Sequence, residues 1–183
     1  MTDQPKHSRR DIILALGASA FAAATIPPAL AARRPIGIRS VALKNIHTGE
    51  HLNAVYWADG RYVPDVMKRI NWVLRDHHTD EVRRIDPDLL DLLTKLQAKL
   101  RTREPYQIIS AYRSAATNAM LAAMTDGVAQ HSLHMHGMAV DIRVPDRSLV
   151  KVQYAALSLA SGGVGFYPRS DFVHVDVGRV RRW

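Results

Sequence analysis

The sequence predicts an α+β fold, with helices in its first half and most of its strands in its second half. Two stretches between residues 64 and 100 carry apolar residues at helical spacing. After residue 105, short apolar or alternating segments recur between turn residues, as strands do. With 47% hydrophobic and 23% charged residues in 183, the chain has the composition of one globular domain.

The N-terminal segment has the features of an export signal. Arg9 and Arg10 stand directly before an apolar run at residues 12–26, an arrangement that resembles the twin-arginine export signal of bacteria. The run is shorter than the ~20 residues of a membrane-spanning helix, and an A-x-A cleavage site ends at Ala31. We therefore predict that residues 1–31 are a twin-arginine-type signal peptide, that no stable membrane span remains after cleavage, and that the protein works in the periplasm.

The mature domain, residues 32–183, begins with a predicted hairpin and two helices. Apolar side chains flank a polar turn within residues 40–57, which is typical of a hairpin. One helix is expected from Pro64, and a second after Asp86-Pro87, because a capping aspartate followed by proline is a common helix start. Their buried faces are formed by apolar residues at helical spacing: Val66, Met67, Ile70, Val73 and Leu74 in the first, and Leu89, Leu92, Leu93, Leu96 and Leu100 in the second.

The later elements alternate between strands and helices. We predict strands at residues 106–110 and 139–144, helices at 114–124 and 147–160, and two final strands at 162–166 and 172–177 that a turn at Pro168 joins.

Composition also excludes several classes of site. The chain contains no cysteine, so disulfides, thiolate metal sites and cysteine nucleophiles are excluded. The net charge of +8 would suit nucleic acid, but the arginines are scattered and no predicted helix has a basic face interleaved with aromatics. We expect no nucleic-acid partner, and a basic surface would equally attract acidic peptidoglycan. Nothing in the sequence requires an oligomer, so we expect a monomer.

The residues richest in possible chemistry lie between Ser132 and Asp141 and around His174. His134, Asp141 and His174 offer two imidazoles and one carboxylate, a donor set that suits Zn²⁺ and leaves a fourth position for water. Gly137 would let the loop bend, so that loop and strand ligands converge. The chain has nine histidines, however, so chance clustering is an alternative that spacing alone does not remove.

A resemblance supports the metal site. The segment from Ser132 to Asp141 fits S-x-H-x-x-G-x-A-x-D at all five fixed positions, and H-x-D follows at His174. This pattern resembles the LAS zinc peptidases, named for lysostaphin, D-Ala-D-Ala carboxypeptidase and sonic hedgehog. Further similarity to the murein endopeptidases of this group covers nearly the whole mature domain, through SAYRSAATNAML, HSLHMHGMAVDI, GGVGFYPRSDFVHVDVG and RRW.

The resemblance implies a small antiparallel sheet that carries zinc and is flanked by helices, as in hedgehog and the D-Ala-D-Ala peptidases. It implies that His134, Asp141 and His174 bind Zn²⁺ and that the substrates are peptidoglycan cross-link peptides. The activity expected is hydrolysis of L,D (3-3) diaminopimelate cross-links, with some D,D (4-3) cleavage, by a zinc-activated water.

Three further residues are candidates for catalysis. Arg113 resembles the arginine that many of these peptidases aim at the substrate, where a guanidinium could bind a carboxylate or an oxyanion. The general base is open between Asp171, three residues before His174, and Asp176, two residues after it. Asp176 is also an alternative third metal ligand, with His174 then as the base.

Other functions remain alternatives at this stage. A carboxypeptidase that trims stem peptides would use Arg113 to bind a terminal carboxylate. A non-catalytic, zinc-containing wall-binding module is the second alternative, because sonic hedgehog keeps this fold without clear peptidase work. A serine hydrolase would use Ser110 or Ser132, but the chain lacks the G-x-S-x-G elbow.

Overall fold

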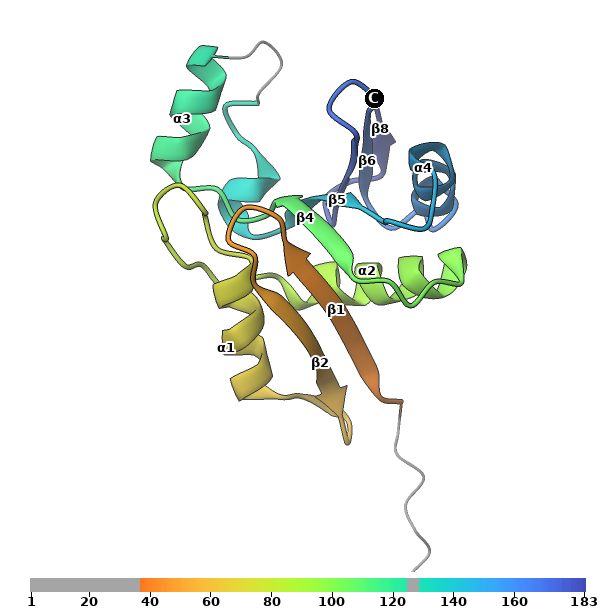
Figure 1. The fold of residues 1–183 in the computed structure, drawn as a ribbon. Coiled ribbons are helices and arrows are strands. Elements are labelled where there is room, and N and C mark those ends of the chain that lie inside the picture. Colours follow the sequence, from red (N-terminus) through yellow and green to blue (C-terminus); the bar gives the residue numbers. More distant parts are fainter. Residues whose placement is uncertain (1–36, 125–128) are drawn as a thin grey trace, which may run out of the picture. The chain divides into compact units, whose positions relative to one another are not determined.

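A single mixed sheet organises the domain in the computed structural model (Figure 1), which describes residues 37–124 and 129–183. Its eight strands lie in the order β3-β2-β1-β4-β5-β7-β6-β8. The predicted signal peptide, residues 1–31, lies outside the described residues. Within the described ranges, no helix is both long and apolar enough to span a membrane.

The first half contains the predicted hairpin and both predicted helices. Its elements are β1 (Arg39–Asn45), β2 (His51–Ala58), β3 (Arg61–Tyr62), α1 (Pro64–Val73) and α2 (Pro87–Leu100). Proline occupies the first helical turn of both helices, where its missing N–H leaves no hydrogen bond unmade. The Asp86 side chain caps α2 by accepting a hydrogen bond from the Asp88 amide at 2.9 Å.

The second half supplies the remaining strands and the site. Its elements are β4 (Tyr106–Ser110), α3 (Ala115–Met124), the 3-10 helix η1 (Leu133–His136), β5 (Ala139–Arg143), α4 (Leu149–Leu157), β6 (Gly163–Tyr167), β7 (Phe172–Asp176) and β8 (Arg181–Arg182). Every helix and strand predicted from the sequence is present. The two-residue strands and η1 were not predicted, because segments so short carry no readable periodicity.

The predicted α+β fold class is confirmed, and the sheet contains both parallel and antiparallel strand pairs. Among the described strands, β1 pairs in parallel with β4, and β6 pairs in parallel with β8, while the other pairs are antiparallel. The chain runs from β1 to β4 through β2, β3, α1 and α2, a connection long enough for a parallel pair. The sheet is therefore mixed, with an antiparallel centre at β4-β5-β7-β6.

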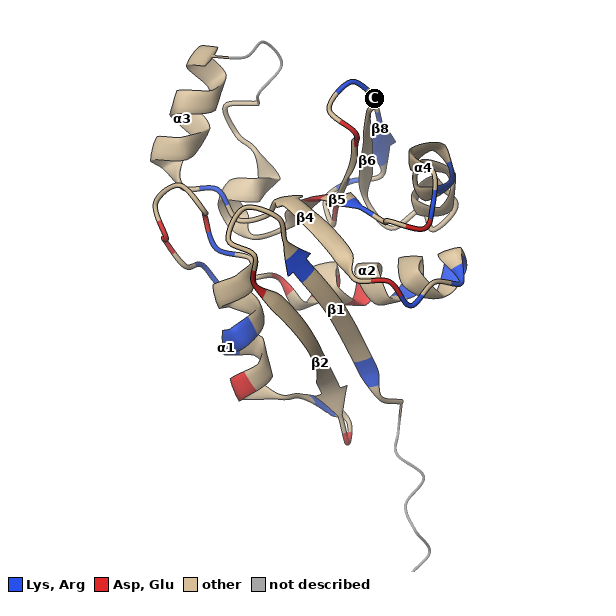
Figure 2. Cartoon of the chain, viewed as in Figure 1, with Lys and Arg blue, Asp and Glu red and all other residues tan. Residues whose placement is uncertain are grey.

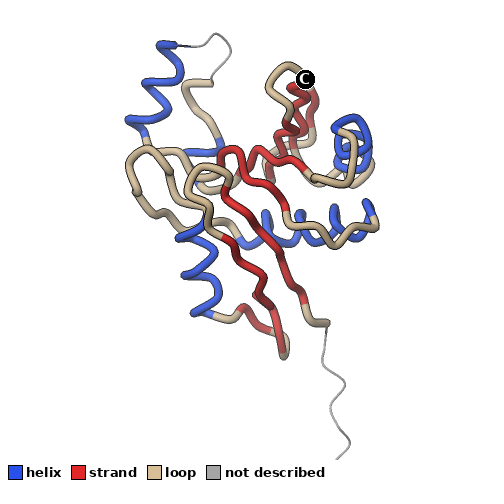
Figure 3. The backbone as a smooth tube through the Cα atoms, viewed as in Figure 1, coloured by secondary structure: helices blue, strands red, loops and turns tan. Residues whose placement is uncertain are grey.

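The leucine face of α2 anchors the core. Leu89, Leu90, Leu93 and Leu96 are fully buried, and α2 contacts both β1 and α4. Helices α1, α2 and α4 lie close to the sheet, whereas α3 stands away from it (Figure 3). Lys and Arg are distributed over α1, α2, α4, β1 and several loops, which agrees with the scattered charge of the sequence (Figure 2).

A substitution at Gly137 should be costly for stability. Gly137 ends η1 with φ +67°, and a Cβ there would lie 2.5 Å from the backbone oxygen of Arg84. Gly49 has φ +75° but open space around it, so it is the matched control. We expect Gly137→Ala to lower the free energy of unfolding by about 1–3 kcal/mol more than Gly49→Ala, as measured by chemical denaturation. Equal losses in the two variants would contradict the close packing described here.

Candidate metal centre

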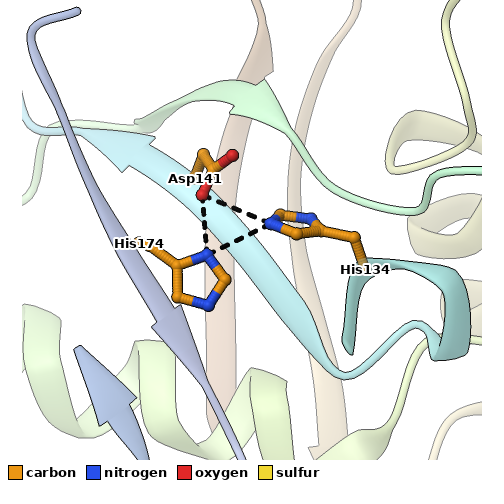
Figure 4. A group of neighbouring side chains, drawn as sticks. All are labelled: His134, Asp141 and His174. Atoms are coloured by element: carbon orange, nitrogen blue, oxygen red, sulfur yellow. Dashed lines mark hydrogen bonds and ion pairs between the residues drawn. The ribbon is translucent and has the colours of Figure 1, made fainter. Parts of the chain in front are cut away.

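Three elements bring the predicted ligands together (Figure 4). His134 comes from η1, whose first turn is capped by the Ser132 hydroxyl, an acceptor for the His134 amide at 3.4 Å. Asp141 lies on β5 and His174 on β7, and the two are directly paired in the antiparallel ladder. Paired residues of adjacent strands present their side chains on the same face, so these two side chains must meet.

The three donor atoms form a compact triangle. His134 Nε2 lies 3.1 Å from His174 Nδ1 and 3.3 Å from Asp141 Oδ1, and His174 Nδ1 lies 2.9 Å from Asp141 Oδ1. Ligand atoms around a tetrahedral zinc ion are roughly 3.3–3.6 Å apart, given metal–ligand distances of ~2.0–2.2 Å, and the triangle is only slightly tighter than this. All three side chains are buried. The donor set and its spacing therefore fit one small divalent cation.

Hydrogen bonds behind the rings orient both imidazoles. His134 Nδ1 lies 2.6 Å from the Ala111 carbonyl oxygen, which can only accept, so Nδ1 carries the proton. His174 Nε2 lies 3.0 Å from Asp176 Oδ2. The other nitrogen of each ring is thereby left to face the triangle with its lone pair, which is how metal-binding histidines are usually held.

Electrostatics keep the carboxylate of Asp141 ionised. Burial raises the pKa of Asp141, but His134 and His174 beside it more than offset this and hold the pKa well below its ordinary value. Burial lowers the pKa of His174, whereas Asp141 and Asp176 raise it, and the net shift is upward. An ionised carboxylate is the form that a cation binds.

Asp176 lies behind His174 and does not line the pocket in front of it. Its side chain is fully buried and accepts hydrogen bonds from the amides of Gly163 and Gly178 and from the guanidinium of Arg181, in addition to His174. These donors lower the pKa of Asp176 even though burial raises it. The Asp176 carboxylate is thus placed to orient His174, and it is not among the atoms that form the triangle.

Asp171 is not brought to the triangle. Its side chain is 61% exposed and forms an ion pair with Arg143 at 2.7 Å. The Asp171 backbone has φ +54°, in the turn directly before β7, and the Arg143 Nε also donates to its carbonyl oxygen at 2.8 Å. The sequence placed this carboxylate three residues from a ligand, but the turn directs it away from the pocket lining.

Arg113, the residue predicted to act on the substrate, lines the pocket. It follows β4, and its amide donates to the His134 carbonyl oxygen at 3.2 Å, which ties it to η1. The guanidinium lies 3.8 Å from Asp141 Oδ2, and its buried Nε has no hydrogen-bond partner among the described residues. Burial lowers the pKa of Arg113 although Asp141 opposes the shift. Arg113 thus brings a positively charged guanidinium to the pocket lining, where such a group is suited to bind an anionic or carbonyl group of a ligand.

Two side-chain clusters in the pocket were missed by sequence reasoning. His47 and His77 stack at 3.8 Å between ring centroids, and burial together with the neighbouring His47 and His78 lowers the pKa of His77 to about 4. The second cluster is aromatic and contains Tyr167 and Trp183. The adjacent pair His77-His78 was a visible signal for the first cluster, but its position opposite residue 47 depends on the tertiary fold.

Comparisons with known proteins assign the chain to a family. The profile of the family described as "Peptidoglycan L,D-endopeptidase MepK" matches residues 33–183, which is most of the chain. The chain belongs to the MepK family of M15 metallopeptidases. It is 43% identical over 178 residues to the peptidoglycan L,D-endopeptidase MepK of Escherichia coli strain K12, covering 96% of this chain and 97% of that protein. It is 40% identical over 146 residues to the probable MepK of Haemophilus influenzae, covering 79% of this chain and 78% of that protein.

Membership in the MepK family makes the chain a peptidoglycan endopeptidase and a metallopeptidase. The resemblance to LAS peptidases stated from the motif is therefore confirmed, and the catalytic class with it. A metal-dependent peptidase needs a cation site in a pocket open to substrate. The triangle of His134, Asp141 and His174 borders a pocket of about 590 Å³ and is a possible site for that metal.

The low pKa of His77 predicts a pH-dependent stability. The unfolded chain binds a proton at His77 near its ordinary pKa of 6.5, but the folded chain does so only near pH 4. The folded state is therefore favoured above pH 6.5, and its advantage declines as pH falls from 6.5 toward 4. We expect the free energy of unfolding to drop more between pH 7 and pH 5 in the wild type than in His77→Gln. Parallel pH profiles for the two proteins would show that His77 is not buried as described.

Proposed function

We propose that this protein is a zinc-dependent endopeptidase that cleaves L,D (3-3) diaminopimelate cross-links of peptidoglycan, with some activity on D,D (4-3) cross-links. The observation that carries the proposal is the buried triangle of two imidazoles and one carboxylate in a MepK-family chain. Nitrogen and oxygen ligands in this number are characteristic of catalytic zinc sites. The relatives at 40–43% identity bear the name L,D-endopeptidase, which supports the preference for that bond.

Each residue of the centre has a defined task in this proposal. His134 Nε2, His174 Nδ1 and Asp141 Oδ1 would hold the ion. When bound, zinc lowers the pKa of a water molecule and polarises a carbonyl group, which makes amide hydrolysis possible at neutral pH. Arg113 would bind the substrate through its guanidinium, either at the scissile carbonyl or at a carboxylate of the peptide.

The proposal also includes export. A twin-arginine-type signal at residues 1–31 would deliver the folded domain to the periplasm, where cross-linked peptidoglycan is accessible. Residues 32–183 would then act as a monomer on cross-link peptides, with no nucleic-acid partner.

Removal of the metal or of a ligand should abolish activity. We expect the purified protein to contain about one zinc ion and to release monomers from defined 3-3 cross-linked muropeptides, with slower release from 4-3 cross-linked ones, as measured by mass spectrometry. Chelation, His134→Ala and Asp141→Ala should each reduce product at least ~100-fold, because the remaining ligands no longer hold the ion in place. Zinc should restore the chelated wild type.

His136→Ala is the matched control, since His136 lies on the same 3-10 helix but is exposed and outside the pocket lining. Unchanged activity in His134→Ala or Asp141→Ala would contradict the proposal. Release of only a terminal residue from uncross-linked stem peptides would identify a carboxypeptidase, in which Arg113 of the pocket lining would bind the terminal carboxylate. Zinc binding with no product from any muropeptide would indicate a wall-binding module instead.

Asp176 and Asp171, the two carboxylates near His174 in sequence, should behave differently. We propose that Asp176 orients His174, so Asp176→Asn should weaken zinc binding by about 10- to 100-fold in a competition assay with a chelator. Asp171 pairs with Arg143 at the surface, so we expect Asp171→Asn to keep both zinc affinity and activity. Loss of activity with full zinc content in Asp171→Asn would instead identify Asp171 as the general base.

A further inference from the structure

The strand register places Tyr167 beside the candidate metal centre. On β6 and β7, Gly165 pairs with His174 and Tyr167 pairs with Phe172. Residues two apart on a strand share a face and lie roughly 6.6–6.8 Å apart along it. Tyr167 therefore lies on the same face of the sheet as His174, two residues further along the paired strands. It lines the same pocket.

Because Gly165 has no side chain, two aromatic rings can pack directly over it. A Cβ at Gly165 would lie 2.8 Å from ring atoms of both Trp183 and Tyr167. The two rings thus occupy the space in front of Gly165, and the Trp183 ring centroid lies 5.2 Å from that of His174. Tyr167 also stacks on Phe172 at 4.6 Å, which holds its ring from the other side.

The hydrogen bond between the two rings determines what the tyrosine can do. Trp183 Nε1 lies 2.7 Å from the Tyr167 hydroxyl oxygen, and an indole N–H can only donate. Tyr167 is therefore the acceptor in this pair, and its own O–H proton remains available. No acceptor for that proton is found among residues 37–124 and 129–183, and Tyr167 lines the same pocket as Arg113 and the triangle.

We propose that the Tyr167 hydroxyl donates a hydrogen bond to the scissile carbonyl oxygen of the substrate as that oxygen becomes negative. Trp183 is a positioning residue, because its N–H fixes the direction in which the Tyr167 proton points. The inference rests on the proposed endopeptidase function and adds no bond-making step to it. Donors held in place before the reaction stabilise developing charge, so this contact should act mainly in the transition state.

The test is Tyr167→Phe, which removes one oxygen atom and keeps the ring that stacks on Phe172. We expect kcat on 3-3 cross-linked muropeptides to fall by about 10- to 100-fold, whereas KM, zinc content and the thermal midpoint stay within about twofold or a few degrees of the wild type. Tyr154→Phe is the matched control, because Tyr154 lies on α4 with 67% exposure and outside the pocket lining. Its kcat should be unchanged.

A second variant tests whether Trp183 acts through Tyr167. Trp183→Phe should lower kcat by a smaller factor, and the double variant should be no slower than Tyr167→Phe alone, since the tryptophan then has no hydroxyl to orient. Wild-type kcat in Tyr167→Phe, or a loss expressed only in KM, would overturn this inference while leaving the endopeptidase proposal intact. Additive losses in the double variant would overturn the role of Trp183. An inactive wild-type protein would instead contradict the proposed function.

Discussion

The antiparallel pairing of β5 with β7 is the constraint on which the site depends. It places Asp141 directly opposite His174, so the carboxylate and the imidazole meet without any contribution from flexible loops. Only His134 arrives from outside the sheet, and its segment is held by the Ser132 cap, by the left-handed Gly137 and by the Arg113 amide. A shift of one residue in this register would move Asp141 or His174 to the opposite face of the sheet.

Charge buried at the centre is compensated by hydrogen-bond donors on neighbouring residues. The fully buried Asp176 would be costly alone, but two backbone amides, Arg181 and His174 all donate to it. Gly163 makes this arrangement possible, since a Cβ at that position would lie 2.3 Å from an Asp176 carboxylate oxygen. The orientation that His174 would need as a metal ligand is thus set by a fully satisfied network behind it.

The pocket in front of the centre differs from that network, because it contains a hydrogen-bond donor that has no acceptor among the described residues. The Tyr167 hydroxyl keeps an unused proton, and the Arg113 guanidinium lines the same pocket. A hydrogen-bond donor that lines a substrate pocket and has no acceptor in the protein is available to a ligand. Hydrogen bonds that hold the predicted ligands in place, together with a free donor in the pocket, are the arrangement expected of a hydrolase.

Sequence alone was sufficient for the longer helices and strands, for the Asp86 cap and for the motif that joins His134, Gly137 and Asp141, since each depends on residues close together in the chain. It also indicated the family through that motif. The tertiary structure decided the partners of the two carboxylates near His174. Asp176 contacts the His174 ring, while the turn before β7 directs Asp171 to Arg143. It also brought Trp183 onto Tyr167 and His77 onto His47. These outcomes depend on backbone direction and on strand register between distant segments, and neither quantity is encoded in the spacing of residues along the chain.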